Sequence, residues 1–299
     1  MPGNSNDAHP DLHEPATDLS RRDFVAFSVA GSLAVAAVPA RAALNVVETE
    51  VTIRTLDGTC DAAFIHPASG SHPGVLIWPD AFGLRPAFRA MSRRLAAEGY
   101  AVLVPNPFYR IGKAPMYESA ADIDLKDPTT MHKLEPLMGS VNAPDAAEKD
   151  AVAYVAFLDA QPQVDRAKQI GTQGYCMGGA LVFRSAAAVP GRVGAGASFH
   201  GGGLVTDKPT SPHLLATKMH GRMYVAVAQN DDQRQPDAKD KLKEAFAAAK
   251  VPALIEVYPA QHGWCVPDMP KEAGAPLYSA PEAERAWAKL LEFYKTSLA

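Results

Sequence analysis

Cysteine is scarce in this chain of 299 residues, which has only Cys60, Cys176 and Cys265. An odd and sparse set of cysteines excludes the disulfide framework that holds many small secreted domains together. The sequence also lacks a run of about 20 apolar residues, the length that a membrane-spanning helix needs. Neither sign of charge is in large excess, because 29 Lys and Arg stand against 33 Asp and Glu, for a net charge of −4. The composition therefore does not favour nucleic acid or a membrane surface as a partner.

Motifs for cofactors and metals are missing as well. Gly201-Gly202-Gly203 lacks the spacing of a dinucleotide-binding loop, and the sequence has no phosphate-binding glycine loop. No cluster of residues has the spacing of metal ligands. We therefore expect neither a cofactor nor a metal. With 47% hydrophobic and 21% charged residues, the chain is suited to a globular fold with a sizeable core.

The first 42 residues have the layout of an export signal. Arg21-Arg22 resembles a twin-arginine motif, residues 25–40 carry no charge, and Ala40-Arg41-Ala42 has the form of a signal-peptidase site. Two features depart from common signals: the region before the arginines is acidic, and Val25-Ala26 replaces the commoner Leu-Lys. The alternative is a disordered tail with a chance pair of arginines. We expect residues 1–42 to be a twin-arginine-type signal peptide, with the export machinery as a partner.

Residues 43–299 would then form the mature protein, a single periplasmic or secreted domain that has no membrane contact once the signal is removed. A twin-arginine route exports folded protein, which would let a free thiol be buried before it meets an oxidising compartment.

Strand-like and helix-like segments alternate along the rest of the chain. Strands are expected at 46–55, 60–65, 74–78, 100–104, 169–173, 194–199, 223–228 and 253–258, and helices at 86–98, 145–159, 236–250 and 281–298. Such alternation predicts an α/β fold with a doubly wound, mainly parallel sheet and helices on both faces. The stretch 111–144 shows no clear period and is either an active-site cover or a long surface excursion.

A glycine-flanked cysteine stands between one strand and the next helix-like run. Gly174-Tyr175-Cys176-Met177-Gly178-Gly179 has the strand, sharp turn and helix context of a nucleophile elbow, in which glycines leave room for the strained turn. The N-terminus of the following helix favours a thiolate, which is the reactive form of cysteine. The alternative is a buried structural cysteine at a glycine-rich helix start.

An acid and a histidine follow two later strands, in the order that this architecture requires. Asp231 and Asp232 come after the strand 223–228, and His262 comes after the strand 253–258. The carboxyl ends of parallel strands are where ligands bind in such sheets. We therefore expect Cys176, His262 and one of the two aspartates to form a catalytic triad, with the other aspartate in a turn or capping role.

These motifs resemble the dienelactone hydrolase family of the α/β-hydrolase superfamily. The resemblance runs from about Val47 to the C-terminus, and its specific parts are Pro79–Leu84, Gly174–Gly179, Asn230–Asp232 and Gln261–Trp264. It implies an α/β-hydrolase fold and hydrolysis of a small ester or lactone through a thioester on the cysteine. It also favours Asp231 over Asp232 as the triad acid. The rival functions are a broader carboxylesterase or thioesterase, and a catalytically silent relative that only binds a ligand.

The resemblance and the elbow geometry also imply an oxyanion hole. One backbone N–H would come from Met177 and the other from Ala81, in the loop after the first buried strand. Asp80 stands where the family typically has a glutamate that contacts the resting thiol, so it is expected either to take that role or to cap its own loop.

The remaining substrate-binding residues are implied by position within the motifs. Arg110 aligns with a family arginine that binds a substrate carboxylate, or it is a solvated surface arginine. Val266 stands where the family has a second arginine, so half of the expected anion-binding pair is missing. Phe82, His200 and Trp264 are expected to line the pocket, although His200 could instead be the polar tip of a flexible loop. Cys265 would line the site or pack as a small apolar residue.

Overall fold

The computed structural model describes residues 43–124, 126–272 and 274–298 of the chain. The expected export signal at 1–42 lies outside these residues. Within the described ranges, no helix has both the length and the apolar character needed to cross a membrane.

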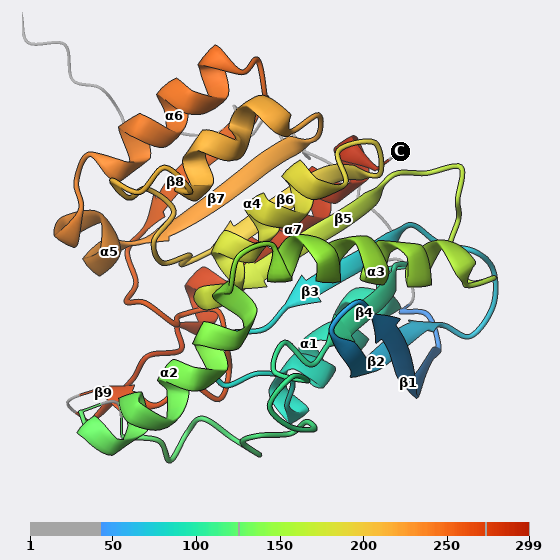
Figure 1. The fold of residues 1–299 in the computed structure, drawn as a ribbon, viewed down its shortest axis with the longest axis horizontal. Helices are drawn as coiled ribbons and strands as arrows, with labels where there is room; N and C mark the ends of the chain where they lie inside the picture. Colours follow the sequence, from blue (N-terminus) through green and yellow to red (C-terminus); the bar gives the residue numbers. More distant parts are fainter. Residues whose placement is uncertain (1–42, 125, 273, 299) are drawn as a thin grey trace, which may run out of the picture. The chain divides into compact units, whose positions relative to one another are not determined.

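One twisted sheet of eight strands dominates the described part of the chain (Figure 1). Its strands are β1 (Val46–Thr55), β2 (Gly58–Pro67), β3 (Gly74–Trp78), β4 (Ala101–Pro105), β5 (Ile170–Tyr175), β6 (Val193–Phe199), β7 (Arg222–Ala228) and β8 (Ala253–Tyr258). Their order across the sheet is β1-β2-β4-β3-β5-β6-β7-β8. The two pairings that involve β2 are antiparallel, and the pairings from β4 to β8 are parallel. The prediction of a mainly parallel α/β sheet is therefore confirmed.

Helices cover both faces of this sheet. They are α1 (Pro86–Ala97), α2 (Pro128–Asn142), α3 (Ala146–Ala160), α4 (Met177–Ala188), α5 (Gln229–Arg234), α6 (Ala238–Ala248) and α7 (Ala280–Ser297). A 3₁₀ helix, η1, spans Pro212–Lys218, and β9 (Lys271–Glu272) pairs with β10 (Ala275–Pro276). Across the sheet, the chain moves in one direction from β3 to β4 and in the opposite direction from β4 to β5. Because crossovers between parallel strands are right-handed, α1 lies on the face opposite to α3 and α4 (Figure 1).

Local chemistry explains the character of several of these elements. The strands from β3 to β6 are buried along their whole length, as expected for strands covered on both faces. Pro86 begins α1 at a position where its missing N–H costs nothing. The expected strands at 46–55 and 60–65 pair as a hairpin, since Thr55 of β1 lies opposite Gly58 of β2.

Two helices were not predicted from the sequence. The stretch 111–144 contains α2, which Asp127 caps by accepting a hydrogen bond from the Thr129 N–H at 2.9 Å. Asp231 and Asp232, one of which was expected in a turn or capping role, lie on the short helix α5, which directly follows β7.

The reversal of direction places β3 and β5 side by side, with connections that leave toward opposite faces of the sheet. In sheets of this kind, ligands bind outside the carboxyl ends of the strands at such a reversal. The segments that follow β3 and β5 begin at Pro79 and Cys176, so the sheet brings the expected oxyanion loop next to the expected nucleophile.

Candidate active site

Cys176 occupies a sharp turn between β5 and α4. Its backbone has φ 53° and ψ −115°, a conformation that is costly for a residue with a side chain. A Cβ on Gly174 would lie 2.1 Å from the Gly178 carbonyl oxygen, and one on Gly178 would lie 2.3 Å from the Trp78 carbonyl oxygen. Glycine is therefore required on both sides of the cysteine, and the turn has the geometry of a nucleophile elbow.

The His262 ring lies between an acid and the thiol. Its Nδ1 atom is 2.7 Å from Asp231 Oδ2, and the ring also forms a hydrogen bond with Cys176. Asp232 does not contact the ring and instead accepts a hydrogen bond from Lys239 Nζ at 2.7 Å. Of the two acids that the sequence left open, the structure places only Asp231 against the histidine.

Electrostatics favour a protonated histidine in this arrangement. Burial alone would lower the pKa of His262, but the hydrogen bonds with Asp231 and Cys176 raise it to about 10. The loop that carries the ring is held in place because the His262 N–H donates to Asn230 Oδ1 at 2.9 Å. An imidazolium between a carboxylate and a thiol can stabilise a thiolate and can later donate its proton.

The two expected oxyanion donors lie in adjoining segments. The first turn of α4 packs directly on the end of β3, since a Cβ on Gly178 would also lie 2.7 Å from the Pro79 carbonyl oxygen. Ala81 lies in a tight turn closed by the Gly83 N–H, which donates to the Asp80 carbonyl oxygen at 3.0 Å. In the described part of the chain, neither the Ala81 N–H nor the Met177 N–H donates a hydrogen bond to the protein. Both groups therefore remain available as hydrogen-bond donors.

Asp80 is buried and bound by Arg85. The guanidinium NH1 and NH2 groups lie 2.7 Å and 3.0 Å from the two carboxylate oxygens, and the Phe82 N–H donates to Oδ1 at 2.9 Å. Both oxygens of Asp80 are thus used within the protein, which agrees with the loop-capping alternative. Sequence reasoning missed Arg85, because nothing in the pattern Leu84-Arg85-Pro86 signals a fully buried arginine.

Arg110 is bound to two carboxylates of the protein. It donates to Asp57 Oδ2 at 2.6 Å and to Asp150 Oδ2 at 2.8 Å, and its guanidinium lies over the Tyr109 ring. Asp57 lies in the β1–β2 turn and Asp150 on α3. These ion pairs neutralise Arg110, which argues against its expected role as the binder of a substrate carboxylate.

His200 packs directly against the candidate triad. The ring centroids of His200 and His262 are 4.9 Å apart, and φ of His200 is 40°. Burial, followed by the charge of His262, holds the pKa of His200 well below its usual range. Its two ring nitrogens have no hydrogen-bond partner among the described residues. His200 is therefore a buried, neutral ring and not the tip of a flexible loop.

Trp264 and Phe82 are both buried, Trp264 in the loop that carries His262 and Phe82 in the loop that carries Ala81. Trp264 stacks on Tyr258 with ring centroids 4.5 Å apart, and the Phe82 ring packs edge-on against Tyr117 at 5.8 Å. Tyr117 belongs to the long segment between β4 and α2. That segment therefore reaches Phe82, one residue beyond the oxyanion candidate Ala81.

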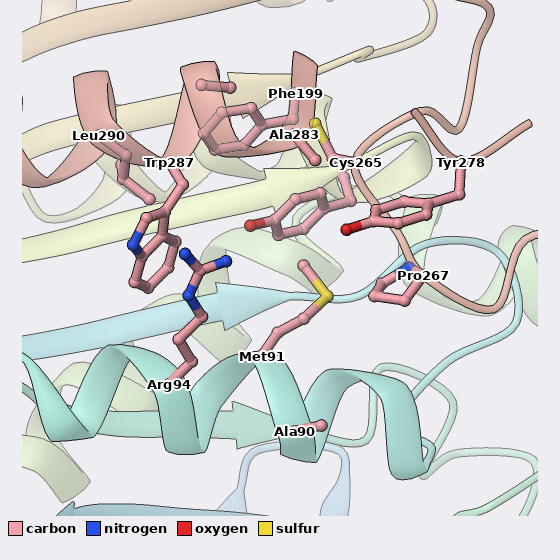
Figure 2. Close-up of a pocket in the computed structure, with 12 residues that line it drawn as sticks. Ala90, Met91, Arg94, Phe199, Cys265, Pro267, Tyr278, Ala283, Trp287 and Leu290 are labelled. Carbon is pink, nitrogen blue, oxygen red and sulfur yellow. The ribbon is translucent and has the colours of Figure 1, made fainter. Parts of the chain in front are cut away.

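A separate pocket of about 210 Å³ lies between α1 and α7. It is lined by Ala90, Met91, Arg94, Tyr175, Phe199, Cys265, Pro267, Tyr278, Ala283, Ala286, Trp287 and Leu290. Figure 2 shows the side chains of Met91 and Tyr278 converging on it from different segments. Cys265 lines this pocket, and burial raises the pKa of its thiol well above the usual range. Cys176 and His262 do not line it, so it is distinct from the candidate site.

The described residues contain no cluster of side chains suited to binding a metal ion. No group of three or more His, Cys, Asp or Glu side chains is placed there to bind a metal ion.

The sheet topology, the elbow and the histidine after β8 define an α/β-hydrolase fold, which enzymes that cleave esters and lactones share with other hydrolases. The sequence model of the dienelactone hydrolase family matches residues 60–298. The chain belongs to the dienelactone hydrolase family.

Known proteins align with this chain over most of their length. A Methylorubrum extorquens protein with the provisional name carboxymethylenebutenolidase is 30% identical over 93% of this chain and 94% of its own. A carboxymethylenebutenolidase from Rhodococcus opacus is 26% identical over 81% of this chain and 88% of its own. The crystal structure of a provisionally named dienelactone hydrolase from Klebsiella pneumoniae superposes with a TM-score of 0.68 at 25% identity, covering 84% of this chain and 99% of the other.

Proposed function

We propose that this protein hydrolyses a small carboxylic ester or lactone through a thioester on Cys176. The observation that carries the proposal is the line of hydrogen bonds from Asp231 through His262 to Cys176, at a strained elbow. The names of the relatives support the same class of substrate, since two of them are named for the opening of a butenolide, which is a lactone.

The reaction begins with attack of the Cys176 thiolate on the substrate carbonyl carbon. The carbonyl oxygen gains negative charge, which the N–H groups of Ala81 and Met177 stabilise. Collapse of this intermediate breaks the ester C–O bond, and His262 donates its proton to the leaving alkoxide oxygen. The products of this half are an acyl thioester and an alcohol, which remain one molecule when the substrate is a lactone.

Hydrolysis of the thioester restores the enzyme. Neutral His262 removes a proton from water as the water oxygen attacks the thioester carbonyl, and the C–S bond then breaks to release the carboxylic acid. Asp231 keeps the ring in the required orientation and stabilises the imidazolium in both halves.

The substrate we propose does not need a carboxylate of its own. Arg110 is neutralised by Asp57 and Asp150, and the position of the expected second arginine is a fully buried Val266. A site without a free cation at these positions favours neutral esters and lactones. A broad carboxylesterase or thioesterase fits the same geometry and remains the alternative.

A panel of p-nitrophenyl acetate, simple lactones and short acyl thioesters tests the proposal and separates these activities. Cys176→Ala should abolish turnover, and Cys265→Ala, which removes a thiol from the separate pocket, should leave it unchanged. Absence of turnover of every substrate by the wild type would favour the silent ligand-binding relative.

We also propose that the protein is exported by a twin-arginine route to the periplasm or beyond. The support is Arg21-Arg22, the uncharged residues 25–40 and the Ala40-Arg41-Ala42 site.

A further inference from the structure

Arg85 is fully buried and lies between two carboxylates. Its NH1 and NH2 groups bind Asp80 at 2.7 Å and 3.0 Å, and its Nε and NH2 groups bind Asp268 at 2.8 Å each. The guanidinium also lies 5.5 Å from the centre of the Phe82 ring and 5.0 Å from that of Phe88. Burial alone would lower the pKa of Arg85, but the hydrogen bonds with Asp268 and Asp80 hold it above the ordinary value. The cation is therefore permanent and fixed on all sides.

The Asp80 end of this cluster sets the turn that carries Ala81. The Asp80 carboxylate accepts the Phe82 N–H, and its carbonyl oxygen accepts the Gly83 N–H. Both bonds close around Ala81, whose own N–H is left without an acceptor in the described chain. The direction of the Ala81 N–H is therefore determined by the position of Asp80.

The Asp268 end belongs to the loop that carries His262. Consecutive turns build this loop, in which the Trp264 N–H donates to the Gln261 carbonyl oxygen and the Val266 N–H to that of Gly263. Asp268 Oδ2 also accepts the Ala120 N–H at 3.2 Å, from the long segment before α2. Arg85 thus connects the histidine loop to the turn with the oxyanion donor, across 183 residues of sequence.

We propose that Arg85 is a positioning residue that, by binding Asp80 and Asp268 together, holds the Ala81 N–H at the place where the oxyanion forms. This inference rests on the proposed function. The planar guanidinium is required, because only its fixed fork of donors can bind two carboxylates in a bidentate manner.

The arrangement acts on the transition state more than on the bound substrate. An oxyanion donor gains most when negative charge develops on the oxygen, and removal of one donor typically lowers kcat by about 10²–10³-fold. Displacement of the donor should therefore lower kcat and leave KM nearly unchanged.

The test uses Asp268→Asn, which removes one charge from the cluster and leaves every catalytic residue in place. Asp159→Asn is the matched control. Asp159 binds Arg192 through a similar pair at 2.7 Å and is 23% exposed, against 19% for Asp268. The Arg192 carbonyl oxygen accepts the N–H of Ile170, the first residue of β5, so this pair lies at the opposite end of the strands from Cys176.

Three quantities are measured in the full-length protein: kcat and KM for p-nitrophenyl acetate, the affinity for a trifluoromethyl ketone, and the alkylation rate of Cys176 by iodoacetamide. The ketone forms a tetrahedral adduct with the thiol and presents an oxyanion. We expect Asp268→Asn to lower kcat and ketone affinity by about 10–100-fold, as partial loss of one oxyanion donor requires. KM and the alkylation rate should stay within about two-fold of the wild type, and Asp159→Asn should change none of these quantities.

The proposal is wrong if Asp268→Asn keeps the wild-type kcat and ketone affinity, or if alkylation falls in step with kcat, since the latter indicates general loss of structure. If Asp268→Asn does not fold, Asp268→Glu keeps the charge and moves it by one methylene, and the same split between kcat and alkylation is expected. An inactive wild type would contradict the proposed function instead, whereas an active wild type with an unaffected variant would contradict only the role of Arg85.

Discussion

His262 Nδ1 and Asp231 Oδ2 lie 2.7 Å apart, whereas the neighbouring Asp232 is bound to Lys239. The two acids are adjacent in the chain and sit on the short helix α5, so one turns toward the histidine loop and the other toward α6. The same substitution, aspartate to asparagine, can therefore be compared at two adjacent positions that differ in their contact with His262.

We expect Asp231→Asn to lower kcat by as much as about 10⁴-fold, the loss seen when the acid of a serine triad is changed in this way. An asparagine leaves the imidazole in the wrong tautomer and without a counter-charge. Asp232→Asn removes only a partly exposed ion pair and should change kcat by less than about three-fold. Steady-state kinetics on both variants check this, and equal, mild effects would move the triad acid to another residue.

The three cysteines differ sharply in their surroundings, which predicts selective labelling. Burial raises the pKa of Cys60 to about 12 and that of Cys265 well above its usual range, so both thiols stay protonated at neutral pH. Cys176 is partly exposed and hydrogen-bonded to His262. One equivalent of iodoacetamide should label Cys176 alone and inactivate the enzyme, as peptide mapping by mass spectrometry will show.

Substitution of the same residue separates a thiol mechanism from simple binding. Cys176→Ala should abolish turnover and keep the fold, and Cys176→Ser should retain only weak activity, because a serine needs full deprotonation by His262. Full activity of the alanine variant, or label confined to Cys265, would remove Cys176 from the mechanism.

The positions of most elements could be predicted because local patterns determine them. The run Gly74–Trp78 is apolar throughout and is a strand buried on both faces, as the sequence indicated. Helix α2 was missed because its buried residues are few, Leu134, Leu137 and Val141, and because Pro136 lies within it. Its weak apolar face and an internal proline give no helical period that could be recognised.

The candidate triad was predictable for a different reason: its residues follow strands in a fixed order. The Arg85–Asp268 pair was not, because its partners are 183 residues apart and neither has a local signature. The expected role of Arg110 did not take Asp57 and Asp150 into consideration. These two acids lie beside Arg110 only because the fold brings them there. Pairing of charges over long sequence distances is decided by tertiary packing, which sequence patterns do not record.

The raised pKa of His262 links the stability of the protein to pH. The pKa is about 10 in the folded state, above the usual value of about 6.5 for an unfolded chain. The extra stability of the protonated ring is therefore fully present below pH of about 6.5 and is lost as pH rises toward 10. The free energy of unfolding in urea should thus fall with pH more steeply for the wild type than for His262→Gln. A gap between the two proteins that stays constant or grows from pH 6.5 to 10 would contradict the assigned shift.

The elbow glycines give a prediction about stability. A Cβ on Gly178 would lie 2.3 Å from the Trp78 carbonyl oxygen, which is rigid backbone, whereas a Cβ on Gly202 would meet nothing within 4 Å. Gly178→Ala should therefore lower the free energy of unfolding by about 1–3 kcal/mol or more, as overpacking does. Gly202→Ala should change it by less than about 0.5 kcal/mol, as for an ordinary surface substitution. Urea unfolding of both variants tests this, and similar values would mean that α4 does not approach β3 this closely.

Export depends on features of the sequence alone and can be tested in a bacterium that has a twin-arginine pathway. The translocation machinery reads the paired arginines, so replacing Arg21 and Arg22 by lysine keeps the charge and removes the recognised side chains. We expect the doubly substituted protein to remain in the cytoplasm as the uncleaved precursor, and Arg41→Lys, outside the pair, to be exported normally. Cell fractionation followed by immunoblotting distinguishes the precursor from a product shorter by about 42 residues, the length of the expected signal. Arrival of the doubly substituted protein in the periplasm at wild-type levels would exclude this route and leave the chance Arg-Arg pair as the better explanation.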